Sequence, residues 1–87
     1  MVAAQEIFEF LKDLILNITD TEEEHIQPST RVEDLGLESM DLVELLIAVR
    51  KKYGVELAPR AFADGNLSTL GQVADYVLEQ LTLKKAG

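Results

Sequence analysis

The sequence contains no cysteine and only one histidine, His25, among its 87 residues. Without thiols, disulfides, thiolate metal ligands and cysteine nucleophiles are all excluded, which fits a reducing compartment such as the cytoplasm. A single histidine supplies too few ligands for a transition-metal site, and no serine lies in the Gly-x-Ser-x-Gly turn of a hydrolase. We therefore expect no metal site and no catalytic centre, and we interpret His25 as a surface residue.

Basic residues are also scarce, with 8 lysines and arginines against 16 aspartates and glutamates, and the formal net charge is −8. Such a surface repels phosphate backbones and anionic lipid heads, so neither nucleic acid nor a membrane is an expected partner. A basic protein surface suits it better, although solubility alone also accounts for an acidic composition. The run Glu22-Glu23-Glu24 lacks the alternating ligands and the glycine of a calcium loop, so no tight cation site is predicted there.

Long apolar runs are absent as well, since no stretch reaches the ~18 residues of a membrane-spanning helix. Residues 1–6 show no basic region followed by an apolar stretch, which an export signal requires. Apolar residues nevertheless make up 47% of the chain, too many for a disordered protein. We expect one free-standing domain over residues 1–87, a monomer in the cytoplasm.

Apolar residues recur at helical spacing in three segments, and no segment alternates as a strand would. In the first segment Ile7, Leu11 and Ile15 share one face. Phe8 and Phe10 lie off that face and are expected to pack under the following loop. The pattern predicts an all-α, four-helix bundle with three long helices, one short third helix and a long first loop. The expected helices span residues 3–17, 39–53, 59–63 and 70–83, and residues 84–87 are expected to fray.

Turn and cap residues support these boundaries. Gly54 follows the second helix and suits the left-handed conformation of a C-cap. Pro59 suits the first position of the short helix. Thr69 and Gln72 have the spacing of a capping box at the start of the last helix.

The loop expected over residues 19–38 is long for so small a domain, and long loops are usually functional or disordered. This one contains four apolar residues: Ile26, Val32, Leu35 and Leu37. We therefore expect the loop to be anchored to the core.

The second helix has more apolar surface than one core face requires. At about 100° per residue, a second apolar stripe lies roughly 100–160° away from the first. The core stripe consists of Leu42, Leu45, Leu46, Val49 and Tyr53, and the second stripe of Met40, Val43 and Ile47. Either another helix covers the second stripe, or the stripe is an exposed recognition surface. Glu44, Arg50 and Lys51 border it, and a charged border favours recognition.

Ser39 begins this helix directly after the loop, and a serine in that position is usually an N-cap. Here it lies in the run Leu35-Gly36-Leu37-Glu38-Ser39-Met40-Asp41. This run resembles the acyl carrier protein family, whose pattern is Leu-Gly, a variable residue, an acidic residue, the modified serine, an apolar residue and often a second acidic residue. The resemblance covers nearly the whole chain, including Tyr53-Gly54 after the second helix.

The resemblance implies that a phosphopantetheinyl transferase moves 4′-phosphopantetheine from coenzyme A to Ser39, and that the arm then holds acyl intermediates as thioesters. The matching partner-binding residues are Glu38, Met40, Asp41, Val43, Glu44 and Ile47. The implied partners are that transferase and acyl-loading and acyl-processing enzymes with basic surfaces. The chain would be a non-catalytic carrier in a fatty-acid, polyketide or specialised pathway.

Three features depart from the family pattern. One is the short helix, where Pro59, Arg60, Ala61 and Phe62 stand at positions that are acidic in fatty-acid carriers. Glu38 stands where aspartate is commoner, and glutamate is a poorer helix cap. Arg50, Lys51 and Lys52 end a helix that tends to be acidic there in fatty-acid carriers, so different partner enzymes are expected. Two other functions stay open at this point. One is a peptidyl or aminoacyl carrier with the same arm, and the other is an unmodified helical module that docks through its second apolar stripe.

Overall fold

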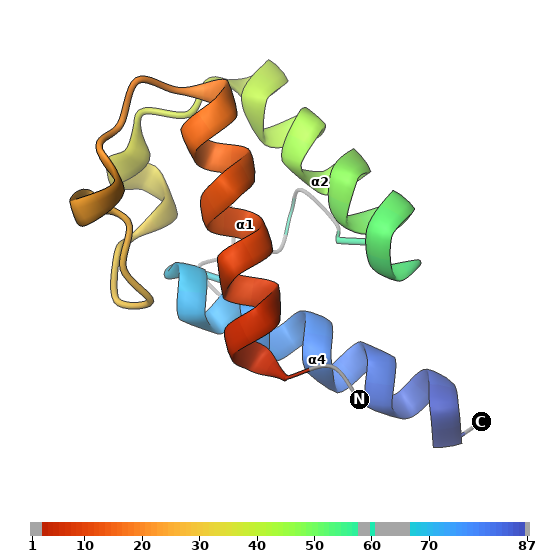
Figure 1. The fold of residues 1–87 in the computed structure, drawn as a ribbon. Helices are drawn as coiled ribbons and strands as arrows, with labels where there is room; N and C mark the ends of the chain where they lie inside the picture. The colour runs from red at the N-terminus through yellow and green to blue at the C-terminus, as the bar shows by residue number, and fades with distance from the viewer. Residues whose placement is uncertain (1–2, 58–59, 61–66, 87) are drawn as a thin grey trace.

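The computed structural model describes residues 3–57, 60 and 67–86 of the chain. Its helices are α1 (Ala4–Ile18), α2 (Ser39–Tyr53) and α4 (Leu70–Ala86), with two short 3₁₀ helices, η1 (Glu23–His25) and η2 (Val32–Leu35), in the first loop (Figure 1). The two N-terminal long helices begin and end within one residue of the predicted bounds. The short helix predicted over residues 59–63 lies outside the described residues, apart from Arg60.

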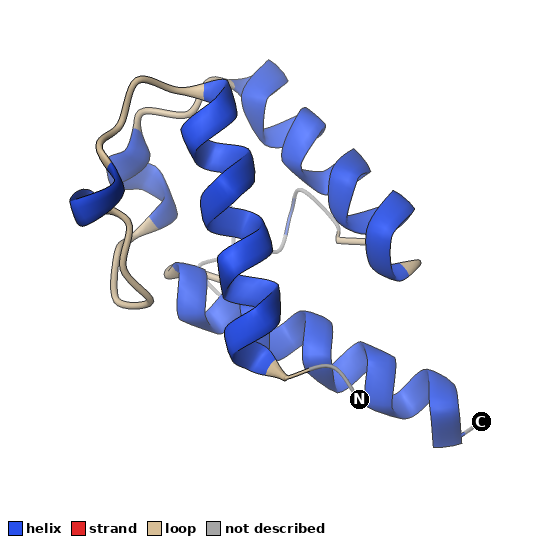
Figure 2. Cartoon of the chain, in the orientation of Figure 1, coloured by secondary structure: helices blue, strands red, loops and turns tan. Residues whose placement is uncertain are grey.

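Helices and loops account for the whole of the described chain, and no strand occurs in it (Figure 2). The one extended pairing is an isolated antiparallel bridge between Arg31 and Thr69. The all-α prediction is therefore confirmed. Within residues 3–57 and 67–86, no helix has both the length and the apolar character needed to cross a bilayer.

α1 packs its predicted apolar face into the core. Ile7, Leu11 and Ile15 follow one another at one-turn spacing, and all three are completely buried. The helix ends at Thr19, which donates its backbone N–H and its hydroxyl to the Ile15 carbonyl, each at 2.9 Å. Both donors of Thr19 therefore close the last turn of α1.

The two phenylalanines off that face lie in different environments. Phe8 is buried and lines a hollow between α1 and the first loop, as predicted. Phe10 instead meets the end of α2, where its ring stands edge-on to Tyr53 at 5.5 Å and the Lys52 ammonium lies 5.9 Å from its centroid. The prediction for Phe10 is wrong because residues 8 and 10 point about 200° apart around the helix. At this contact burial, with a smaller effect of Glu6, raises the pKa of the Tyr53 phenol.

α4 crosses α1 and supplies the facing side of the core (Figure 1). Its buried residues are Leu70, Val73, Ala74 and Val77. The predicted capping box is present, since Gln72 N–H donates to the Thr69 hydroxyl at 3.2 Å and Thr69 N–H donates to Gln72 Oε1 at 3.0 Å. α4 continues three residues beyond the predicted end near Leu83, to Ala86, whereas fraying of residues 84–87 stays a prediction. No proline or glycine lies between Leu83 and Ala86 to end the helix earlier.

The first loop is anchored to the core by its apolar side chains, as predicted. Ile26, Val32 and Leu35 are buried, and Leu37 packs partly buried against the same cluster. Both 3₁₀ helices therefore lie on a loop whose apolar positions are fixed.

Backbone hydrogen bonds also tie this loop to the start of α4. They run from Val32 N–H to Ser68 C=O (2.8 Å), from Leu70 N–H to Thr30 C=O (3.0 Å) and from Gly71 N–H to Pro28 C=O (2.8 Å). The approach is close at Gly71, where a Cβ atom would lie only 3.0 Å from the Pro28 carbonyl oxygen. The missing side chain therefore lets the loop backbone reach the helix.

Candidate functional site

The chain reaches Ser39 through a sharp turn at Gly36. η2 buries Val32 and Leu35, which fix the end of the first loop. Gly36 then takes a φ of 69°, a left-handed conformation that glycine adopts without strain. A Cβ atom there would meet nothing within 4 Å, so the backbone conformation favours glycine and crowding does not. The half-buried Leu37 completes the anchor before α2 begins.

Glu38, and not Ser39, is the N-cap of α2. The backbone N–H of Glu38 donates to Asp41 Oδ2 at 3.2 Å, and the Glu38 side chain faces the Asp41 N–H in a reciprocal capping box. The first intrahelical bond runs from Leu42 N–H to the Glu38 carbonyl at 3.0 Å. A serine at this position usually caps the helix. Ser39 does not, because Glu38 already occupies the N-cap position.

Ser39 is the first residue inside α2 and is exposed. Within the described part of the chain its hydroxyl makes no hydrogen bond, and neither do the backbone N–H groups of Ser39 and Met40. The first N–H groups of a helix have no intrahelical partner, and the helix dipole makes this end attractive to a phosphate. An accessible alcohol beside free N–H groups fits a covalently attached phosphodiester.

A serine nucleophile would need a base, and the only histidine does not supply one here. His25 lies in η1, exposed, with Nε2 3.9 Å from the Glu22 carboxylate. No contact between His25 and Ser39 is found among the described residues. Within the described residues, Ser39 therefore has no neighbouring histidine of the kind that activates the serine of a hydrolase.

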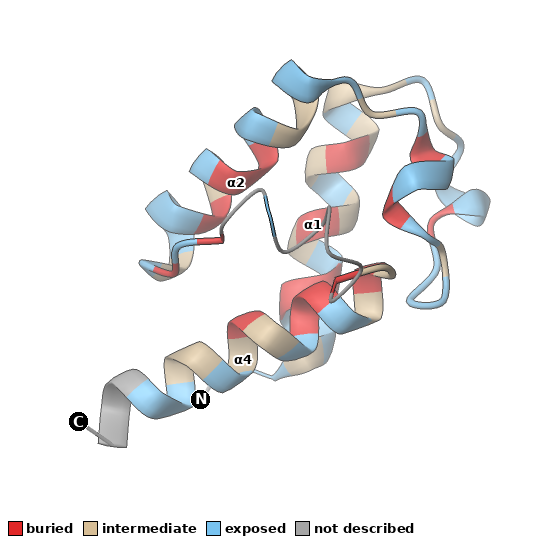
Figure 3. Ribbon diagram, turned by 180° about the vertical axis from the view of Figure 1, so that it is seen from behind, coloured by how far each residue is buried: buried red, intermediate tan, exposed pale blue. Residues whose placement is uncertain are grey.

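The second apolar stripe of α2, which we call the exposed strip (Met40, Val43 and Ile47), faces solvent. Met40 is 78% exposed, and Val43 and Ile47 are each 47% exposed. The opposite side of the helix is its core face, where Leu45, Leu46 and Val49 are buried (Figure 3). No helix within the described residues covers the exposed strip. Among these residues, the alternative that a neighbouring helix buries the strip is therefore not supported.

Charge along α2 changes sign from one end to the other. Asp41 and Glu44 lie near the serine, whereas three basic residues occupy the last turn. Arg50 pairs with Glu56 at 3.6 Å, and the Lys52 ammonium lies over an α1 ring. Lys51 makes no ion pair within the described residues. The order of charges opposes the helix dipole at both ends and stabilises the helix.

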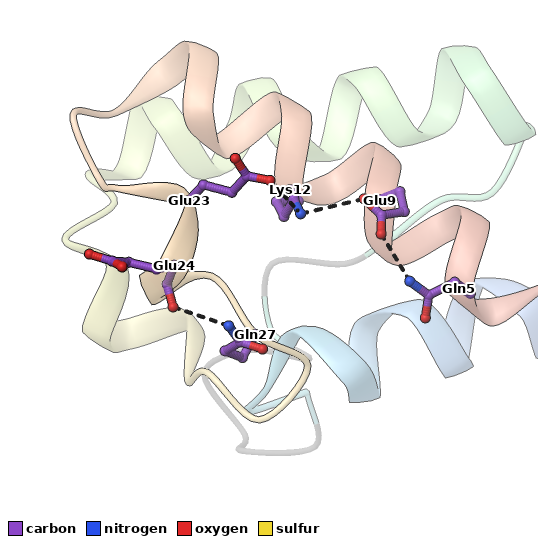
Figure 4. Close-up of polar contacts among 6 residues, drawn as sticks. All are labelled: Gln5, Glu9, Lys12, Glu23, Glu24 and Gln27. Atoms are coloured by element: carbon purple, nitrogen blue, oxygen red, sulfur yellow. Dashed lines mark hydrogen bonds and ion pairs between the residues drawn. The ribbon is translucent and has the colours of Figure 1, made fainter.

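A hollow of about 720 Å³ between α1 and the first loop was not predicted. Lys12 lies at its wall with its side chain 18% exposed, 3.0 Å from Glu23 and 3.6 Å from Glu9 (Figure 4). The hydrogen bond that Lys12 donates to the Glu23 carboxylate raises the pKa of Lys12, against an opposing effect of burial. At the rim Gln5 donates to Glu9 at 2.9 Å. The sequence offers one signal for this contact, since Lys12 is the only lysine or arginine before Arg31.

Three exposed side chains at the loop also approach one another. Carboxylate oxygens of Glu22 and Glu24 and a ring nitrogen of His25 lie within 4.8 Å of one another. All three are exposed, and exposed acidic groups come together on many acidic surfaces without holding an ion. This proximity alone gives no reason to assign a metal there.

Comparison with known proteins bears on the same segment. Residues 9–77 match the family model described as "Phosphopantetheine attachment site". The matched stretch contains η2, the Gly36 turn, Ser39 and all of α2.

Curated proteins named acyl carrier protein are similar over most of the chain. That of Clostridium perfringens (strain 13 / Type A) is 35% identical over 74 residues, covering 84% of this chain and 95% of the relative. That of Wolinella succinogenes is 32% identical over 72 residues, covering 82% and 92%. That of Coprothermobacter proteolyticus is 36% identical over 74 residues, covering 84% of each chain.

Proposed function

The chain belongs to the acyl carrier protein family, and from this premise we propose that Ser39 is its attachment residue and that the attached arm holds acyl intermediates as thioesters. Family membership implies a covalently bound 4′-phosphopantetheine group. When bound, the group supplies a thiol that forms thioesters. The protein's own part is to bind, orient and present that arm, so it is a carrier and not an enzyme.

The exposed, unpaired Ser39 hydroxyl at the start of α2 is the observation that supports this assignment. Of the three serines, Ser39 alone begins a long helix, and it lies between two residues of a capping box. Because Glu38 and Asp41 together cap α2, the Ser39 hydroxyl oxygen is not needed as a cap. Its backbone N–H and that of Met40 remain available to phosphate oxygens.

The exposed strip and the acidic residues around the serine form the proposed partner surface. Its members are Glu38, Met40, Asp41, Val43, Glu44 and Ile47. The proposed partners are a phosphopantetheinyl transferase and acyl-loading and acyl-processing enzymes whose surfaces are basic. Small apolar contacts rimmed by charge suit encounters that form quickly and end quickly, because rim charges raise association rates more than affinity. We place the carrier in the cytoplasm as a monomer.

The decisive experiment is modification in vitro. The purified chain is incubated with coenzyme A and a promiscuous phosphopantetheinyl transferase, and its intact mass is measured. We expect the mass to rise by one phosphopantetheine group. Ser39→Ala should block the increase, whereas Ser29→Ala, which changes another exposed serine, should leave it intact. An unchanged wild-type mass would overturn the assignment and favour an unmodified interaction module. A mass increase that persists in Ser39→Ala would also overturn it, because another residue would then carry the group.

A further inference from the structure

One acidic and one basic residue lie in line with the exposed strip on the surface of α2. Met40, Glu44, Ile47 and Lys51 follow at steps of four, three and four residues, which places them along one line of the helix surface. Glu44 and Lys51 therefore flank Ile47 on the same face, and neither pairs with another residue within the described part of the chain. A partner that covers the strip meets a negative group near the serine and a positive group at the far end.

Lys51 is the basic residue of this helix end that is available to a partner. Arg50 is engaged by Glu56 at 3.6 Å, and Lys52 is turned toward the Phe10 ring. Lys51 is exposed and aligned with the strip. Along the helix it lies 12 residues from Ser39, a distance of about 18 Å.

Given the proposed carrier function, on which this inference rests, we propose that the acyl-loading enzyme of this carrier places an acidic residue opposite Lys51. The same enzyme presents basic residues to the acidic end around Ser39, about 18 Å away along the helix. Such a two-signed contact fixes the direction in which the enzyme lies along α2. An enzyme docked in the reverse direction would bring like charges together at both ends, and like-charge contacts reject wrong partners. Correct docking therefore brings the Ser39 end to the enzyme's active-site entrance.

Charge complementarity favours an enzyme over a second copy of the chain. Two copies would each bring a net charge of −8 to the contact. The strip itself offers only three apolar side chains, far below the area that a stable dimer interface buries. An encounter of this size instead fits a partner that supplies the opposite charges and then leaves.

The test uses the full chain in its holo form, and the probe is a purified enzyme that loads acyl groups onto the wild-type holo chain. Each variant is first converted with coenzyme A and the transferase, and its intact mass is checked. A failure of the carrier function therefore appears before docking is measured. KM and kcat for acyl loading are then compared for wild type, Lys51→Glu, Lys52→Glu and the double variant Glu44→Lys/Lys51→Glu, which keeps the net charge unchanged.

We expect Lys51→Glu to raise the KM for the carrier about fivefold or more at low salt, with kcat unchanged. Lys52→Glu makes the same charge change one residue along, on a different side of the helix, and should alter KM less than about twofold. The double variant should be at least as impaired as Lys51→Glu. Equal effects of Lys51→Glu and Lys52→Glu, or a double variant as active as wild type, would overturn the proposal. So would a wild-type dimer in sedimentation that Lys51→Glu dissociates, since the strip would then belong to a second copy.

Discussion

The first loop and the start of α2 are neighbours in sequence but differ in how completely they are fixed. Residues of the loop are held by buried apolar side chains, by backbone bonds to the start of α4 and by the Lys12 contacts. Three residues of α2 that are equally apolar are left in solvent, and Ser39 beside them makes no side-chain hydrogen bond in the described chain. In this small domain the anchored loop fixes the turn that leads into α2, where the Ser39 side chain stays exposed.

The same substitution in each region should separate these two roles most strongly. Ile26 is 2% exposed, so Ile26→Ala should lower the free energy of unfolding by about 3 kcal/mol, through lost burial and a cavity. Ile47 lies on the exposed strip, and Ile47→Ala should cost less than about 1 kcal/mol because much of its surface is already in water. Urea unfolding followed by circular dichroism measures both.

Acyl loading should rank these two variants in the opposite order to stability. Both variants are loaded with phosphopantetheine and tested for acyl loading under conditions where each is folded. Ile47→Ala should impair loading and Ile26→Ala should not. Equal losses of stability in the two variants would mean that the strip is covered in solution, which contradicts the comparison between the two regions.

The sequence was sufficient for the α2 side of this comparison and insufficient for the loop. Helical spacing alone separated Leu45 and Val49 from Met40 and Ile47, because that separation depends only on the angle between residues along one helix. Ser39 could be singled out because its motif is local. The backbone hydrogen bond from Gly71 to Pro28, by contrast, joins residues more than forty positions apart, and no periodicity reports such a pairing.

The prediction for Phe10 failed because it depends on packing between helices. Phe10 was assigned to the loop because it lies off the α1 core face, but which neighbour an off-face side chain meets depends on how α1 and α2 cross. Glu38 is a poorer cap than aspartate by its own preference, and the capping box with Asp41 makes this cap a property of two residues. The fold class and the strip follow from the order of residues within a helix, whereas these contacts follow from packing between elements and from paired side chains.

The turn that joins the two regions gives a smaller effect. Gly36→Ala should lower the free energy of unfolding by about 1–2 kcal/mol, because its left-handed φ strains a residue that has a Cβ atom. Gly36→Asn should lose less, since asparagine tolerates this conformation. Chemical denaturation measures the free energy of unfolding of both variants. Because no atom lies within 4 Å of the Cβ position, crowding does not contribute to the loss. Matching losses for Ala and Asn would contradict an origin in the backbone conformation.

The Lys12 contacts should give the smallest effect, and pH distinguishes it from packing. Glu23 raises the pKa of Lys12 above 10.5 in the folded protein, so the charged form is favoured by folding. The resulting stabilisation is fully present below the unfolded pKa and is lost as pH rises through the higher folded value. Lys12→Met, which keeps the apolar stem, should therefore lower Tm at pH 7, and the gap from wild type should shrink above pH 10.5. Glu23→Gln should reproduce most of the gap at pH 7. If the Tm difference between Lys12→Met and wild type stays constant through this range, Lys12 acts through the packing of its apolar stem along the hollow. The loop would then be held by apolar contacts and backbone hydrogen bonds alone.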